Sequence, residues 1–371
     1  MPVICRRVLS VFLLLFAASP AFSLPTMIRL GYNNCAACHI TPQGGGLLTP
    51  YGKGIDTAQS LQRREVTATD EPRRSLYDVR FVLGASHFAS QQPTSSMTSS
   101  NVRMMLRNMV TLSSHTAVSY QAGMDTAVAK KPAGNAGTAD FVVTKALFEY
   151  RPTEGVAFQI GRDTLPSGLG LPDPQTFLRR QNDPLGTAYP VQAKAFFWTS
   201  RFELAPYAYG PGFDETDRTA RQHGGGVVGG VDIWKQRAVL GMTTRTARSS
   251  TFERRSVGAY ARLGFGRWGI LGEHDLTSRI TRLSALAPAD NVVGFTQFFV
   301  AAREWFVTSL LVDDVVALRS GGKHLYRLAP SAQMRISDNV TVVLSTRDEF
   351  ITGLASNSRT YSVSIAVKSV R

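Results

Sequence analysis

From about residue 74 onwards, apolar and polar residues alternate along the chain with a period of two. The last segment shows the pattern clearly, because Tyr361, Val363, Ile365 and Val367 alternate with Thr360, Ser362, Ser364 and Lys368, and only Ala366 interrupts the polar set. A period of two is that of a β-strand, in which successive side chains point to opposite faces. The pattern therefore predicts strands with one apolar face each.

The stretch from residue 326 to residue 347 predicts a hairpin. Its first arm has an apolar face of Tyr326, Leu328, Ala332, Met334 and Ile336 and an opposite face of Arg327, Ser331, Gln333 and Arg335. Ser337, Asp338 and Asn339 are turn-forming residues, and the alternation resumes at Val340. Two alternating arms joined by such a turn pair as antiparallel strands.

The same alternation predicts strands along the rest of this region. They lie near 77–83, 102–112, 148–150, 156–160, 193–206, 224–234, 237–247, 255–265, 267–277, 292–303 and 305–318. Short turns such as 264–267 alternate with longer polar loops such as 125–138, 210–222 and 279–291. We expect an all-β chain of about 14–16 strands, each with an error of roughly two to four residues at its ends.

Strands with one apolar face, joined alternately by short turns and long loops, are typical of a transmembrane antiparallel β-barrel. The alternatives are a soluble sandwich, whose strands are usually shorter, and a propeller, which would show a repeat of about 40–50 residues. The sequence has no such repeat. Many outer-membrane barrels end on an aromatic residue, whereas this chain ends Lys368-Ser369-Val370-Arg371. We predict a barrel over residues 74–371.

Residues 1–23 resemble a secretory signal peptide. Arg6 and Arg7 precede an apolar core from Val8 to Ala18, and Ala21-Phe22-Ser23 is a cleavage pattern of small residues. The apolar core is too short to span a bilayer comfortably, and no later run of 18 apolar residues follows. The expected location is the outer membrane, with the periplasm as the alternative.

The chain is basic, with a formal net charge of +14 over 371 residues and a low charged fraction of 18%. A basic net charge of this size favours binding to nucleic acid, binding to an anionic membrane surface or conduction of anions through a pore. Export and the lack of a nucleic-acid-binding motif argue against nucleic acid. Seven basic residues fall on the polar strand faces and would line a barrel lumen: Arg80, Arg103, Arg107, Lys145, Arg327, Arg335 and Arg347. A basic lumen favours anions and repels Fe²⁺.

Cys35-Ala36-Ala37-Cys38-His39 is the attachment pattern of a c-type haem. Cys35 and Cys38 would form thioethers to the haem, and His39 would be the proximal ligand of its iron. A zinc site needs four ligands, a redox dithiol needs a βαβ context, and a disulfide between the two cysteines does not account for His39. We therefore expect one covalently attached haem c.

Residues 24–73 form a short haem module that includes the glycine-rich stretch 43–46. Glycines allow a backbone to pass close to a flat ligand, although a flexible linker is an alternative. About fifty residues bury too little core to enclose a haem alone, so we expect the module to plug the barrel. Candidates for a sixth iron ligand are Met27 within the module and Met105 and Met109 on a predicted lumen face. An open sixth position is the alternative.

Residues 161–192 interrupt the strand pattern with several prolines and glycines, which indicates a loop of fixed shape. Such a loop lies either over the outside of a barrel or inside it as a constriction. It contains Arg162, Arg179 and Arg180, whose guanidinium groups match haem propionates. Their alternative partners are the nearby carboxylates of Asp163, Asp173 and Asp183.

An exported chain with one N-terminal C-x-x-C-H motif and a downstream barrel resembles the fused monohaem cytochrome–porins of the bacterial outer membrane. At the level of residues the resemblance rests on Cys35, Cys38 and His39. It implies electron transfer at or across the outer membrane with a periplasmic or extracellular redox partner, and its best-known members are implicated in iron oxidation. An electron carrier is favoured over a catalyst in its own right, with a metal-oxidising activity as the alternative, and no hydrolytic motif stands out. The alternatives are an anion-selective diffusion porin with a haem-bearing appendage and a soluble periplasmic haem enzyme.

Overall fold

The computed structural model describes the chain in two parts. Of the N-terminal part it describes residues 26–30, 38–39, 48–49, 51–52, 55, 58–59 and 61. Of the remainder it describes residues 75–370 apart from 92–93, 126–139, 167, 170–175, 179–188, 213–220, 236, 282–288, 319–323, 338 and 353–356. The predicted signal peptide lies outside the described residues.

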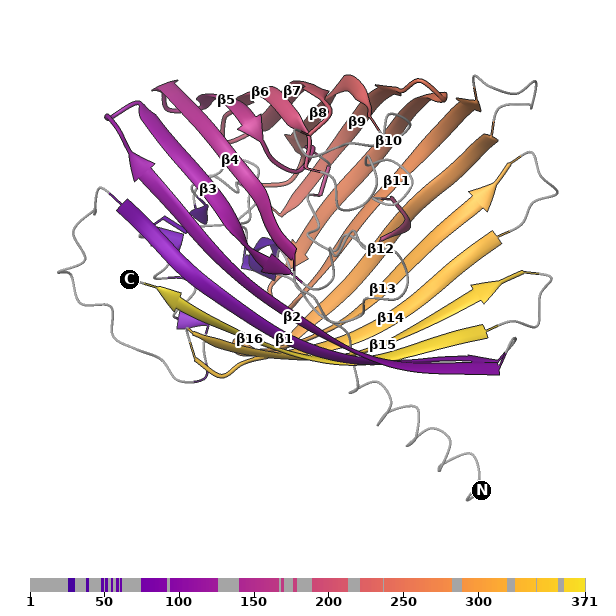
Figure 1. Ribbon diagram of the computed structural model, residues 1–371. Helices are drawn as coiled ribbons and strands as arrows, with labels where there is room; N and C mark the ends of the chain where they lie inside the picture. The colour runs from indigo at the N-terminus through magenta and orange to yellow at the C-terminus, as the bar shows by residue number, and fades with distance from the viewer. Residues whose placement is uncertain are drawn as a thin grey trace.

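The second part is a closed barrel of sixteen antiparallel strands, which confirms the predicted all-β barrel (Figure 1). Each strand pairs with the next in the sequence, and β1 pairs with β16 to close the cylinder. The strands are β1 (Ser75–Gln91), β2 (Thr94–Thr111), β3 (Thr116–Asp125), β4 (Asp140–Thr153), β5 (Val156–Arg162), β6 (Val191–Trp198), β7 (Phe202–Gly210), β8 (His223–Asp232), β9 (Ala238–Arg248), β10 (Phe252–Phe265), β11 (Trp268–Thr281), β12 (Ala289–Arg303), β13 (Phe306–Ala317), β14 (His324–Arg335), β15 (Val340–Ile351) and β16 (Asn357–Val370).

The two faces of the strands are inverted relative to a soluble protein. Along β10, Arg254, Ser256 and Arg262 are buried, whereas Val257 is 52% exposed. Exposed apolar side chains recur around the outside of the barrel, including Leu83, Met104, Ile160, Leu240, Met242, Leu276, Val300 and Val363. Closed barrels cross membranes because every backbone group is paired and the outer face is apolar. The protein is therefore a transmembrane barrel of the outer-membrane type. The described part of the chain contains no helix that is long and apolar enough to cross a membrane.

At one end of the barrel every connection is a short turn, whereas the long connections lie at the other end, together with the short ones from β1 to β2 and from β9 to β10. All four tryptophans of the chain, Trp198, Trp234, Trp268 and Trp305, lie in or beside the short turns. The rings of Trp234 and Trp268 both pack against the ring of Phe265, at centroid distances of 5.5 Å and 4.4 Å respectively. Indole rings prefer the level of the lipid headgroups. The short-turn end therefore lies at one membrane surface, and in barrels of this type that surface is periplasmic.

One predicted strand was wrong. The range 193–206 is two strands, because the chain turns between β6 and β7. The Thr199 side-chain oxygen accepts the N–H groups of Arg201 and Phe202 at 3.1 Å and 3.2 Å, and the Thr199 N–H donates to the Phe202 carbonyl. Threonine and serine favour such turns, but aromatic residues on both sides hid this one from the alternation.

Candidate functional site

The loop after β5 enters the lumen, which decides between its two predicted positions. The N–H groups of Gly168 and Leu169 donate to the two carboxylate oxygens of Glu273 on β11, at 3.0 Å and 2.9 Å. The N–H of Phe177 donates to both oxygens of Asp313 on β13, at 3.1 Å and 3.0 Å. Both carboxylates are buried. Two acidic side chains of the barrel wall therefore hold the backbone of this loop across the lumen.

Apolar packing fixes the same loop along its length. Leu165 joins a cluster on β5–β10 that includes Tyr207 and Tyr260, and Phe177 and Leu178 join a second cluster on β11–β14. A Cβ atom at Gly168 would lie 2.3 Å from the ring of Tyr260, so only glycine allows this approach. The lumen face of β5–β14 is consequently filled by the loop.

Two buried arginines complete the attachment. Arg245 on β9 donates to the Pro166 carbonyl at 3.1 Å and to the Tyr207 hydroxyl at 3.0 Å. The Arg327 guanidinium on β14 lies 4.1 Å from the centre of the Phe177 ring. Arg327 also forms ion pairs with Asp313 at 3.0 Å and with Glu349 at 2.9 Å. These pairs keep its guanidinium beside Asp313, which binds the Phe177 N–H of the loop.

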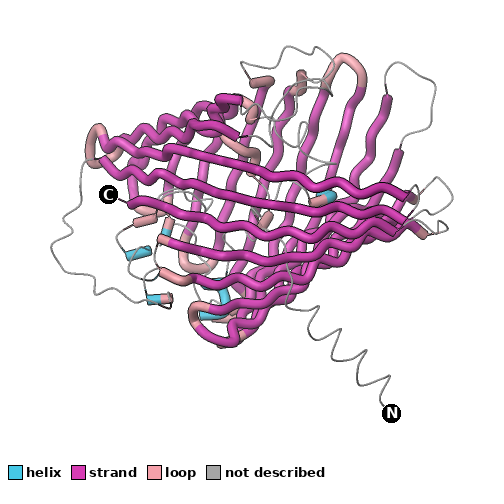
Figure 2. Tube along the Cα trace, turned by 60° about the horizontal axis from the view of Figure 1, so that its bottom comes forward, coloured by secondary structure: helices cyan, strands magenta, loops and turns pink. Residues whose placement is uncertain are grey.

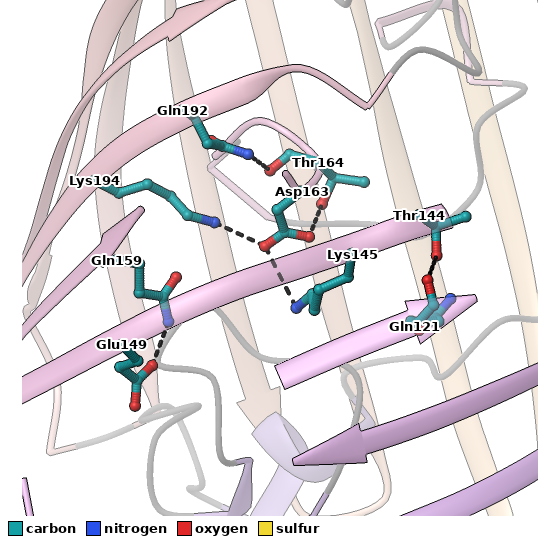
Figure 3. Close-up of polar contacts among 9 residues, drawn as sticks. All are labelled: Gln121, Thr144, Lys145, Glu149, Gln159, Asp163, Thr164, Gln192 and Lys194. Carbon is teal, nitrogen blue, oxygen red and sulfur yellow. Dashed lines mark hydrogen bonds and ion pairs between the residues drawn. The ribbon is translucent and has the colours of Figure 1, made fainter. Parts of the chain in front are cut away.

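At the start of the loop, the carboxylate of Asp163 forms ion pairs with two lysines (Figure 3). Its Oδ2 atom lies 2.8 Å from the Lys194 ammonium and 3.4 Å from the Lys145 ammonium. Burial by itself raises the pKa of Asp163, but the charges of Lys145 and Lys194 outweigh burial, and the pKa lies below its ordinary value. The two ammonium groups therefore favour the ionised form of this carboxylate.

Local pairing of Arg162 with Asp163 was one of the two alternatives for this arginine. Arg162 lies over the ring of Tyr189 at 5.8 Å, and lysines from β4 and β6 occupy Asp163 instead. Sequence neighbours on an extended chain point to opposite sides, so residues 162 and 163 face different partners. Arg179, Arg180, Asp173 and Asp183 lie outside the described residues.

The basic residues that alternation assigned to the lumen do face it, and two of them, Lys145 and Arg327, contact carboxylates at the loop. Lumen-facing positions of β14–β16 and β1–β4 carry all seven of the basic residues named above: Arg80, Arg103, Arg107, Lys145, Arg327, Arg335 and Arg347. Among the described carboxylates, Asp125 pairs with Arg103 at 2.6 Å, while Glu273 and Asp313 are occupied by the loop. Glu273 and Asp313 thus hold the loop, and Arg80, Arg107, Arg335 and Arg347 make the wall of β14–β16 and β1–β2 basic.

The N-terminal part attaches to the short-turn end of the barrel. The 3-10 helix η1 (Thr26–Leu30) contacts β10 and β11. Arg29 donates from its side chain to the Gly266 carbonyl at 3.1 Å, and its own carbonyl accepts the Gly266 N–H at 2.9 Å. The other guanidinium nitrogen donates to Gln59 at 2.6 Å, and the Leu61 N–H donates to the Arg335 carbonyl at 3.0 Å. We call the contacts among Arg29, Gln59 and Gly266 the Arg29 clasp.

The clasp and the contact of Leu61 with Arg335 together tie both ends of the segment that contains the C-x-x-C-H motif to the barrel. Residues 29 and 59 lie on either side of that motif in the sequence, and both side chains are buried. Burial lowers the pKa of Arg29 and the nearby Glu304 opposes this, but guanidinium groups stay charged in either case. In Figure 2 most of the short helical pieces gather at the barrel end where the C-terminus lies. The motif is therefore carried at the mouth formed by the short turns.

Within the segment, Cys38 and His39 are held against residues 48–52. The Cys38 carbonyl accepts the Thr49 N–H at 2.9 Å, and His39 forms an isolated antiparallel bridge with Leu48. A Cβ atom at Gly52 would lie 2.1 Å from the Cys38 carbonyl oxygen, so the two backbones touch. Residues 48–52 are therefore packed closely against the backbone of Cys38 and His39. This packing fits attachment of a flat group by Cys38 and His39.

The thiol of Cys38 is free and buried, and burial raises its pKa. Redox-active and metal-binding thiols have lowered pKa values, so this environment argues against the dithiol alternative. No group of three or more His, Cys, Asp or Glu side chains within the described ranges could hold a metal ion. Cys35 lies outside those ranges, and its part in the motif remains a prediction.

The three methionines proposed as a sixth ligand occupy two separate parts of the molecule. Met27 is half-buried in η1, against the short-turn end. Met105 and Met109 lie on the lumen face of β2, and Met105 is 2% exposed. The predicted lumen orientation of these two is confirmed by the burial pattern. The choice of a sixth ligand stays a prediction.

The sequence analysis missed the residues that hold the loop and the module. Glu273, Asp313 and Arg245 were not singled out, and Arg29 was not considered. The available signal was a charged residue at a lumen position whose neighbours on the same face are apolar, as Glu273 is beside Leu271 and Asp313 beside Leu311. A charge in such a place needs a specific partner.

Comparison with known proteins supports the fold and nothing finer. Neither a family model nor a curated protein sequence matches the chain. The structure is similar to OmpT, an outer membrane protein of Vibrio cholerae, with a TM-score of 0.59, 9% identity, 82% of this chain covered and 100% of that chain. It is equally similar to an anion-selective porin from Comamonas acidovorans, with a TM-score of 0.59, 11% identity and 80% and 100% coverage. The structure is also similar to the outer membrane channel DcaP of Acinetobacter baumannii, with a TM-score of 0.56 and 8% identity over 80% of this chain and 97% of that chain. The chain has a porin-like fold of the bacterial outer membrane.

Proposed function

We propose that this protein is a porin-like barrel that transfers electrons at the outer membrane through one covalently bound haem c at its short-turn mouth. The observation that carries the proposal is the Arg29 clasp, because it joins residues on both sides of the C-x-x-C-H motif to each other and, through Arg29, to the barrel. Cys35 and Cys38 would hold the haem, and His39 would ligate its iron. The bound haem supplies one-electron transfer.

The chain's own residues would place and shield that group. The clasp sets the distance between the motif and the turn at Gly266, and the contacts of Thr49 and Gly52 with Cys38 fix the orientation of the motif. The barrel mouth supplies the covering surface that about fifty residues lack. One haem spans little of an apolar layer of about 25 Å, so a redox partner at the periplasmic or the outer side is needed.

The first test is a haem-stained gel of outer-membrane fractions run with and without boiling. We expect a haem-positive band whose mobility changes on boiling, since closed barrels resist unfolding in detergent until heated. The variant Cys38→Ser should lose the stain and keep the mobility change. A haem-positive band in the soluble periplasm, or a membrane band without haem, would contradict the proposal.

A second candidate, an anion-preferring diffusion pore, is favoured by the basic wall opposite the docked loop. Arg107 and Arg347 face the lumen from β2 and β15 and are only partly buried. Positive side chains at a narrow passage concentrate anions. In planar bilayers with a salt gradient, we expect a reversal potential that indicates a preference for chloride over potassium.

This preference should fall in the double variant Arg107→Gln/Arg347→Gln. It should be unchanged in Arg255→Gln, because Arg255 is exposed on the outward face of β10. A barrel that shows no preference, or one that is insensitive to the lumen variant, would exclude this candidate while leaving the haem test unaffected.

A further inference from the structure

Three adjacent short turns differ in composition from the other turns at their end of the barrel. They join β8 to β9, β10 to β11 and β12 to β13, and together they carry Lys235, Arg237, Arg267 and Arg303, all exposed. Three of the four tryptophans lie there as well: Trp234, Trp268 and Trp305. We call residues 233–237, 265–268 and 303–306 the basic aromatic rim.

The remaining short turns carry fewer basic residues. The turn from β4 to β5 is Glu154-Gly155, and Arg151 just before it lies over the ring of Trp198 at 5.9 Å. The turn from β2 to β3 is Leu112-Ser113-Ser114-His115, and the turn from β6 to β7 is Thr199-Ser200-Arg201. The described part of the turn from β14 to β15 contributes Ile336, Ser337 and Asn339. Basic side chains and indole rings are therefore most numerous on the sector of the three turns, and a smaller group at Arg151 and Trp198 lies on another sector.

Contacts between the backbones join the three turns into one surface. The Gly264 N–H donates to the Arg237 carbonyl at 2.9 Å, and the Ala301 N–H donates to the Arg267 carbonyl at 2.7 Å. Trp234, Phe265 and Trp268 form a continuous row of rings across two of the turns. The carboxylates of the same sector are Asp232, which accepts the Trp234 N–H at 3.0 Å, and Glu304, which lies near Arg29.

The turn that presents Lys235 has an unusual backbone. Lys235 adopts a φ of +39°, in the left-handed region that glycine occupies without cost and that other residues rarely adopt. A lysine kept in a conformation that suits glycine suggests a use for its side chain. Here the strained residue points one more positive charge into the sector that already holds three arginines.

We infer that the basic aromatic rim binds the phosphate groups of anionic phospholipids in the membrane leaflet at the short-turn end. Indole rings settle at the headgroup level, and Lys and Arg side chains near that level attract anionic lipids by about 1 kcal/mol each. The rim places both kinds of side chain on the same three turns. A soluble acidic protein would be expected to use charge that faces the aqueous space, without a row of rings on the lipid side.

The inference does not rest on the haem, since the rim belongs to the barrel. Its place is nevertheless informative, because the turn at Gly266 is also held by the Arg29 clasp. The turn at Gly266 would therefore contact lipid on its outer side and the N-terminal segment on its inner side.

The test uses the full-length protein reconstituted into vesicles of zwitterionic phosphatidylcholine with one-tenth phosphatidylglycerol. After extraction in mild detergent, the retained lipid is measured by mass spectrometry. We expect phosphatidylglycerol to be enriched over its share in the vesicle. In the double variant Arg237→Gln/Arg267→Gln the retained phosphatidylglycerol should fall to about its share in the vesicle, as expected for the loss of two headgroup-level charges.

The matched control is Arg201→Gln/Arg255→Gln, which removes two exposed charges outside the rim and should retain the enrichment. Repeating both measurements with Cys38→Ser separates this inference from the haem proposal. Equal retention in all proteins, or an equal loss in both double variants, would overturn the inference. So would a rim variant that keeps its lipid and loses only a co-purifying acidic protein.

Discussion

Replacement of Arg327 by methionine should destabilise the barrel and release the lumen loop at the same time. The Arg327 side chain is 1% exposed, and that of its partner Asp313 is fully buried. Removal of one member of a buried ion pair leaves an uncompensated charge, which costs about 3–5 kcal/mol. The same change removes the guanidinium from the Phe177 ring. We expect a lower temperature for loss of the folded band on unboiled gels and a larger single-channel conductance.

The double variant Arg327→Met/Asp313→Leu separates the two effects. Apolar replacement of a whole buried pair is often close to neutral, so most of the stability should return. The conductance should stay high, because the Phe177 N–H has lost its acceptor. The control Arg359→Met removes an exposed arginine that bonds Asp348 on the outward face, and it should cost less than about 1 kcal/mol. A single variant with unchanged conductance would show that the loop does not depend on this pair.

The parts of the fold that follow from local alternation were predictable. Strands with a period of two determine which side chains face lipid and which face the lumen, so Arg103, Arg107 and Arg347 were assigned to the correct face without knowledge of the pairing. Closure into sixteen strands agrees with the upper limit of the expected range. The error at 193–206 arose where a threonine–serine turn is flanked by aromatic residues that also suit strands.

The position of the loop depends on residues more than a hundred positions away. Gly168 meets Glu273 and Phe177 meets Asp313 only after the barrel has closed. The residues of 161–192 do not by themselves reveal these barrel partners, because the same turn-forming residues suit a loop outside the barrel and a loop inside it. The Arg29 clasp has the same character, because its acceptor at Gly266 belongs to a turn more than two hundred residues later. Predicting both needs the register of the strands, which alternation alone does not give.

Both long-range attachments use charged side chains to hold backbone groups, and this bears on the function. Glu273 and Asp313 are occupied by N–H groups of the loop, so they contribute little negative charge to the open passage. Arg29 is occupied by Gly266 and Gln59 at the mouth. The lumen keeps a basic wall while its acidic residues act as supports. A haem with anionic propionates near such a mouth would meet positive charge.

Replacement of Gly52 by valine should abolish haem attachment and leave the barrel intact. A Cβ atom at residue 52 would lie 2.1 Å from the Cys38 carbonyl oxygen and 2.9 Å from the Cys38 Cα, both of them backbone atoms that cannot rotate away. The clash would separate Thr49 and Gly52 from the motif, because the Gly52 N–H bonds the Thr49 side chain and Thr49 bonds Cys38. We expect at least a tenfold loss of haem stain per folded barrel on unboiled gels.

The neighbouring residue supplies the control for this change. Tyr51 is 51% exposed, so Tyr51→Val introduces the same side chain beside Gly52 without meeting Cys38, and its haem stain should equal that of the unmodified chain. The barrel does not include residue 52, and both variants should keep the change in mobility on boiling. Full haem stain in Gly52→Val would show that close backbone packing at Cys38 is not needed to hold the motif. Loss of the haem stain in both variants would show that any change at residues 51–52 prevents haem attachment. The close packing of Gly52 against Cys38 would then not explain the effect.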